Sequence, residues 1–120
     1  MKKQETKKEF NLEQAFALWK TFGKNGGVYF TGKDCNNNKL IAFENKTKKN
    51  EKEPDYRVYN LGEDGKKETN VANLWNTTSK GGMNYLTGST DTKGEYLVAY
   101  FSKKEEQNIP YIVAYFKENN

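Results

Sequence analysis

Two segments of this 120-residue chain are versions of one another. The first, residues 18–32, reads LWKTFGKNGGVYFTG, and the second, residues 74–88, reads LWNTTSKGGMNYLTG. They lie 56 positions apart, and the same offset relates Pro54 to Pro110. A period of this size indicates two copies of one supersecondary unit, each too small to bury its apolar face alone. We therefore predict one domain in which both copies share a core.

Glycine, asparagine and proline residues divide each copy into predicted strands. Asn25 and Gly26 readily adopt the positive backbone angles that a tight hairpin requires. Pro54 has no amide donor, so it should precede a strand rather than interrupt one. The strands expected in the first copy are about 16–22, 28–33, 40–44 and 55–60. The second copy should repeat them, which gives eight strands in all.

The predicted fold is all-β, with two tandem four-stranded antiparallel meanders packed as one sandwich-like or barrel-like domain. In order, the chain would contain a flexible N-terminal tail (1–10), a first β repeat (11–60), a linker (61–69) and a second β repeat (70–120). Residues 11–15 fit either a short helix or a strand. Trp19 and Trp75 should occupy equivalent, largely buried positions.

The residue types limit the chemistry that the chain can support. Histidine is absent, which removes the usual general base at neutral pH and the commonest metal ligand. Cys35 is the single cysteine, so neither an intrachain disulfide nor a cysteine–histidine nucleophile can form. Carboxylates fall in lysine-rich loops, which is typical of solvated charge. We predict no enzymatic activity, no cofactor and no metal site.

Charge and hydropathy suggest the kind of partner. There are 20 lysine and arginine residues against 16 aspartate and glutamate residues, a net charge of +4. This excess permits binding to a polyanion, although AT-rich coding alone would also enrich lysine. Arg57 is the one arginine, which argues against bidentate readout of guanine. No apolar run approaches the roughly 20 residues that span a bilayer, and no signal-peptide core is present. We expect a cytoplasmic protein without a membrane partner.

Tyrosines form the candidate binding site. Segments 96–101 and 111–116 are apolar on both faces, so we expect the first copy or a partner to cover one face. Strand alternation would gather tyrosines on one side, beside lysine-containing loops. The proposed binding residues are Tyr85, Tyr96, Tyr100, Tyr115, Lys80, Lys93, Lys103 and Lys104. Such a face suits stacking of unpaired bases, a protein interface, or packing against the first copy.

Three parts of the sequence resemble a known family: the Leu-Trp pairs, SKGGMNYLTG at 79–88 and EPDYRVY at 53–59. They are similar to small proteins of phages, plasmids and conjugative elements, grouped as domain-of-unknown-function family 736 with relatives in low-GC bacteria. The second copy departs from the pattern at 109–111, which reads Ile-Pro-Tyr. The resemblance implies a mobile-element setting in a bacterial host cell and no established activity.

Two hypotheses about function follow. The first is a non-enzymatic binding protein that acts on single-stranded nucleic acid or on a host nucleoprotein. The second is an anti-CRISPR-type inhibitor that binds a host defence nuclease, for example a CRISPR effector, by direct protein–protein contact. The sequence leaves open the choice between DNA, RNA and protein, and also the oligomeric state.

Overall fold

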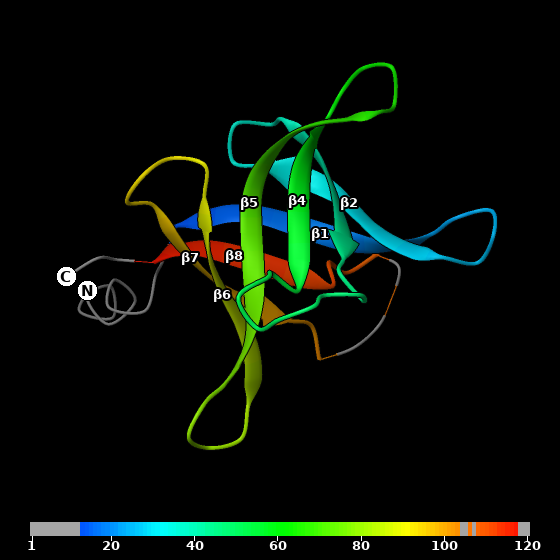
Figure 1. The fold of residues 1–120 in the computed structure, drawn as a ribbon. Helices are drawn as coiled ribbons and strands as arrows, with labels where there is room; N and C mark the ends of the chain where they lie inside the picture. The colour runs from blue at the N-terminus through cyan, green and yellow to red at the C-terminus, as the bar shows by residue number, and fades with distance from the viewer. Residues whose placement is uncertain (1–12, 104–105, 107, 118–120) are drawn as a thin grey trace.

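The computed structural model describes residues 13–103, 106 and 108–117. These residues form eight β strands and no helix, which confirms the all-β prediction (Figure 1). The predicted tail, residues 1–10, lies outside the described residues. The strands are β1 (Gln14–Phe22), β2 (Val28–Asp34), β3 (Lys39–Glu44), β4 (Tyr56–Leu61), β5 (Lys67–Thr78), β6 (Asn84–Thr90), β7 (Tyr96–Phe101) and β8 (Ile112–Lys117).

The eight strands make a closed barrel in chain order, and every neighbouring pair is antiparallel. Of the two forms considered from the sequence, the barrel is therefore the observed one. Strands β1–β4 come from the first repeat and β5–β8 from the second. Because β1 pairs with β8 and β4 with β5, neither repeat closes by itself. Closure also leaves no unpaired sheet edge.

The two repeats are related by a pseudo-two-fold axis that runs along the barrel. Equivalent backbone hydrogen bonds show this, because Tyr111 N donates to Leu18 O at 2.7 Å and Asp55 N donates to Leu74 O at 2.8 Å. Tyr111 follows Asp55 by 56 residues and Leu74 follows Leu18 by 56 residues, so the two bonds are equivalent. Strands β1 and β5 lie four strands apart in the ring, on opposite sides of the barrel. Equivalent outward-facing residues of the two repeats therefore point in opposite directions.

The interior is packed with aliphatic side chains, as expected for a barrel of eight strands. The largest fully buried residues are Leu18, Leu40, Leu74, Leu86, Leu97, Ile112 and Val58. Aromatic rings close one end of the barrel in a cycle, with centroid distances of 5.6–6.4 Å between neighbours. This aromatic plug consists of Phe30, Tyr56, Phe101 and Tyr111.

The repeated Thr-Gly pairs mark a close approach of two backbones. Gly32 on β2 lies opposite β1, and a Cβ atom there would overlap the carbonyl oxygen of Ala17. Gly88 on β6 stands in the same relation to Asn73 on β5. Any side chain would push the neighbouring strand away. Glycine is thus needed at both positions so that the sheet can curve into a closed barrel.

The structure refines three expectations. Residues 14–15, which fitted helix or strand, belong to β1. The expected linker is shorter, since only residues 62–66 separate β4 from β5. Trp19 and Trp75 are equivalent, opposite Thr31 and Thr87 respectively. Both indoles lie on the outside of the barrel and are only partly buried, so neither belongs to the core.

The close approach at Gly88 gives a stability prediction. Gly88→Ala should lower the free energy of unfolding by about 3 kcal/mol or prevent folding, because a backbone carbonyl blocks the added methyl group. Gly27→Ala is the matched control, since nothing lies within 4 Å of a Cβ atom there. It should change the free energy by less than about 0.5 kcal/mol. Urea denaturation measures both, and equal effects would contradict this account of the glycine.

A second prediction concerns alkaline pH. Burial raises the pKa of Tyr56 well above its ordinary value of 10.0, with smaller contributions from Glu44, Tyr111 and Asp55. The protonated phenol therefore stabilises the fold fully below pH 10, and this contribution declines above it as unfolded Tyr56 ionises. Tyr56→Phe removes the dependence but keeps the ring. Above about pH 10, the free energy of unfolding of the variant should rise relative to that of the parent by up to about 1.4 kcal/mol per pH unit.

Urea denaturation of both proteins at about pH 8 and about pH 11 measures this difference. A constant gap between the two proteins across this range would show that Tyr56 ionises freely in the fold.

Candidate functional site

Three of the proposed tyrosines form a ladder across β6, β7 and β8. The rings of Tyr85 and Tyr100 stack with centroids 6.1 Å apart and an interplanar angle of 26°. The rings of Tyr100 and Tyr115 are 6.2 Å apart. The alternate residues of these strands point into the core, so the ladder lies on the outer face of the barrel. We call these three residues the tyrosine ladder.

This outer face is open to solvent. Tyr96 is 46% exposed and Tyr100 is 40% exposed, while Tyr85 and Tyr115 are partly buried. The sequence predicted that the first copy or a partner covers one face of β7 and β8. The first copy covers their inner face, because Leu97 and Ile112 share one core with Leu18 and Leu40. The other face lies on the outside of the barrel. The four proposed tyrosines therefore do not pack against the first copy, whereas Tyr111 does, because its ring stacks on Phe30.

Tyr96 lies apart from the ladder, at the other end of β7, where it pairs with Lys117 of β8. Its ring lines a shallow depression of about 540 Å³ beside the indole of Trp75. A second depression of about 350 Å³ lies over Tyr85 and Tyr100. The two share Thr87 and Lys117 and form one surface, which we call the second-repeat trough. It is lined by Trp75, Ser79, Met83, Tyr85, Thr87, Gly88, Ser89, Tyr96, Leu97, Val98, Tyr100 and Lys117.

The proposed lysines divide between the two ends of the barrel. Lys80 lies in the β5–β6 turn and Lys103 follows β7, both at the end that holds the aromatic plug. Lys93 lies in the β6–β7 turn at the opposite end. Lys104 lies outside the described residues. Lys117, which was not among the proposed residues, lines both parts of the trough. The sequence could have indicated this, because residues two apart on a strand, such as Tyr115 and Lys117, lie on the same face.

The outer face of β6–β8 carries no carboxylate. Its nine outward positions hold tyrosine, threonine, serine, valine and lysine, and the only charge among them is positive. They are Tyr85, Thr87, Ser89, Tyr96, Val98, Tyr100, Val113, Tyr115 and Lys117. Such a surface favours an anionic or neutral ligand over a cationic one.

The first repeat carries an equivalent ladder that the sequence reasoning missed. The rings of Tyr29 and Phe43 stack at 6.3 Å, and those of Phe43 and Tyr59 meet at 6.2 Å. The offset of 56 already related Tyr29 to Tyr85 and Tyr59 to Tyr115, so the signal was present in the sequence.

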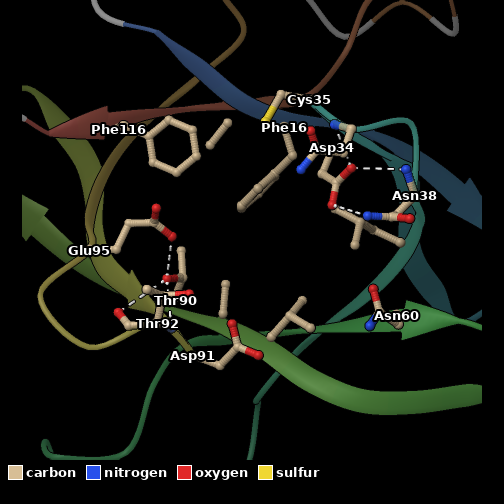
Figure 2. A pocket seen from close by; sticks show the side chains of 15 residues that line it. Phe16, Asp34, Cys35, Asn38, Asn60, Thr90, Asp91, Thr92, Glu95 and Phe116 are labelled. Carbon is tan, nitrogen blue, oxygen red and sulfur yellow. Dashed lines mark hydrogen bonds between the residues drawn. The ribbon is translucent and has the colours of Figure 1, made fainter.

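A different candidate is the cavity of about 350 Å³ at the barrel end opposite the aromatic plug (Figure 2). Two of its three carboxylates, Asp34 and Glu95, have hydrogen-bond partners, and the third is Asp91. Asp34 accepts hydrogen bonds from the backbone amides of Asn36 and Asn38, each at 2.9 Å, and Glu95 accepts one from Thr90 Oγ1 at 2.7 Å. These bonds stabilise turns. Nowhere in the described part of the chain do three His, Cys, Asp or Glu residues gather in a way that could hold a metal ion.

The Glu-Pro-Asp motif of the first repeat has a structural role. Asp55 Oδ2 accepts a hydrogen bond from Asn76 N on β5 at 2.8 Å, and Oδ1 pairs with Lys48 Nζ at 3.1 Å. Trp75 Nε1 donates to Lys52 O at 3.0 Å. The loop between β3 and β4 is thereby fixed against β5. It contacts Trp75, which lines one end of the second-repeat trough.

We expect Asp55→Ala to release this loop. Loss of a charged acceptor should lower the free energy of unfolding by about 1.5–3 kcal/mol. It should also increase iodide quenching of Trp75 fluorescence in a Trp19→Phe background. Glu51→Ala, an exposed carboxylate in the same loop, is the control and should change neither quantity. Unchanged quenching in Asp55→Ala would contradict the coupling between the loop and Trp75.

No family model, curated protein or solved structure matches this chain. The resemblance to domain-of-unknown-function family 736 stays a prediction from the sequence. In the described residues, no helix is long and apolar enough to cross a membrane.

Proposed function

We propose that the protein works by binding, without catalysis, and that it holds single-stranded nucleic acid in the second-repeat trough. The observation that carries the proposal is the exposed tyrosine ladder, which continues past Lys117 to Tyr96 and Trp75 on a face without carboxylates. Aromatic rings bind unpaired bases of any sequence, because every base has a π face. Paired bases in a duplex do not offer those faces.

The trough provides separate places for stacking and for phosphate contact. Tyr96 and Tyr100 are four residues apart on one strand, or about 13 Å, so they would stack different bases. Lys117 lies opposite Tyr96 and lines both depressions. Lys80 and Lys103, at the end nearer Tyr100, would attract the backbone as it leaves the trough.

Two further observations support a binding role. The chain has no histidine, and the Asp34 and Glu95 carboxylates of the cavity opposite the plug form turns. The mobile-element setting implied by the sequence resemblance also fits, because small proteins of such elements often serve replication or transfer.

Trp75 provides a direct test, because it lines the trough. In a Trp19→Phe protein, a short oligothymidylate should quench Trp75 fluorescence, and added salt should weaken binding. Tyr100→Ala should weaken binding roughly 5- to 150-fold, the range expected for one stacked ring. Tyr100→Phe keeps the ring and should bind within about threefold of the parent. Absence of quenching at low salt would overturn the proposal.

The alternative is an inhibitor that docks on a host nucleoprotein such as a CRISPR effector. One observation favours it: the hairpins β1–β2 and β5–β6 extend away from the barrel (Figure 1) and carry exposed Phe22 (61%) and Met83 (53%). Exposed apolar side chains often contribute to protein interfaces. Inhibition of a purified CRISPR nuclease that is lost in Phe22→Ser and Met83→Ser, with no oligonucleotide binding, would favour this function. Inhibition unaffected by these changes would reject the docking role of the hairpins.

A further inference from the structure

The first repeat has a trough of its own, at the place equivalent to the Trp75 end of the second-repeat trough. A depression of about 580 Å³ surrounds Trp19 on the outer face of β1–β4. Thr31 and Gly32 line it just as Thr87 and Gly88 line the other. The remaining lining residues are Gln14, Ala17, Lys33, Asp34, Lys39, Leu40 and Leu61. We call this depression, together with Tyr29, Phe43 and Tyr59, the first-repeat trough.

The two troughs match in their ring contacts. Phe43 takes the place of Tyr100 at the centre of its ladder, and both central rings stack on their partner from the preceding strand, with interplanar angles of 29° and 26°. The outward positions of β2–β4 carry no carboxylate, although Asp34 at the end of β2 lines one edge of the depression. They are Tyr29, Thr31, Lys33, Lys39, Ile41, Phe43, Arg57, Tyr59 and Leu61.

The first-repeat trough is richer in positive charge. Lys33, Lys39 and Arg57 occupy outward positions where the second repeat has uncharged residues. Lys67 Nζ lies 4.5 Å from the ring centroid of Tyr59 and 5.5 Å from that of Phe43. A cation held over these rings is well placed to contact a phosphate beside a stacked base. The chemistry therefore suits the same class of ligand.

The pseudo-two-fold axis sets where the troughs lie. Because the axis runs along the barrel, the two troughs face away from each other across its width. A ligand that fills one trough leaves the other free.

We infer that each chain has two single-strand-binding sites, one per repeat, on opposite sides of the barrel. This inference rests on the proposed function and extends it to a second site. A chain with two such sites can hold two strands, or two segments of one strand, at the same time. Linking them in this way raises the local concentration of the second strand near the first.

Two single-tryptophan proteins separate the sites. Trp19→Phe keeps Trp75 as the reporter of the second-repeat trough, and Trp75→Phe keeps Trp19 as the reporter of the first. Each is titrated with an oligothymidylate of about four to six nucleotides, near the smallest site size of a single-strand-binding fold. We expect quenching of both reporters. Isothermal titration calorimetry of the unmodified protein should give two oligonucleotides per chain.

Matched ladder variants assign each signal to its site. Phe43→Ala should weaken the Trp19 response roughly 5- to 150-fold and leave the Trp75 response within about twofold, and Tyr100→Ala should do the reverse. Tyr59→Ala is a second variant of the first ladder in case Phe43→Ala does not fold, which circular dichroism checks. Of the three ladder residues changed, Phe43 and Tyr100 are exposed and Tyr59 is partly buried.

The outcomes distinguish the inference from the proposed function. Quenching of Trp75 alone, with one oligonucleotide per chain and no effect of Phe43→Ala, would overturn the second site and leave the proposed function intact. Failure of both reporters, with no heat of binding, would overturn both. Quenching of both reporters that is abolished by either ladder variant alone would indicate one continuous site and would also overturn the inference.

Discussion

The barrel depends on the close contact between neighbouring strands at Gly32 and at Gly88. At each glycine the two backbones are so close that a Cβ atom would overlap a carbonyl group of the neighbouring strand. That carbonyl belongs to Ala17 for Gly32 and to Asn73 for Gly88. This allows the sheet to curve tightly enough for β8 to pair with β1. Closure then fixes the inner width, which aliphatic side chains fill, and leaves the two aromatic ladders and both tryptophans on the outside.

Closure from two repeats also gives the molecule equivalent outer faces. The repeats have diverged where they need not match. At one pair of equivalent positions, Asp55 anchors a loop to β5, whereas Tyr111 places its ring in the aromatic plug. The two ladders have kept their geometry despite this divergence, although the central ring is phenylalanine in one and tyrosine in the other. The two repeats thus differ at the end of the barrel and remain similar on its outer faces, which fits a functional role for the outer faces.

The cavity opposite the plug and the outer troughs differ in what they offer a ligand. In the cavity, the carboxylates of Asp34 and Glu95 already accept hydrogen bonds within turns (Figure 2). A ligand there would compete with these bonds. In the troughs, Phe43, Tyr96 and Tyr100 are exposed, as are the lysines Lys33, Lys39 and Lys117. Stacking on these rings would bury apolar surface. This difference is the physical reason to assign binding to the outer faces.

The turns and the all-β class could be predicted from the repeated sequence, because glycine, asparagine and proline act through local backbone geometry. The sequence also placed Tyr85, Tyr100 and Tyr115 on a common side of their strands, since side chains alternate along a strand. Only the tertiary structure decided which side faces outward. Tyr96–Phe101 is apolar on both faces, and just the narrow interior of a closed barrel selects Leu97 and Ala99 for the core. Closure likewise decided that Trp19 and Trp75 lie outside and that Lys93 is far from Lys80, because these relations depend on strand pairing between distant segments.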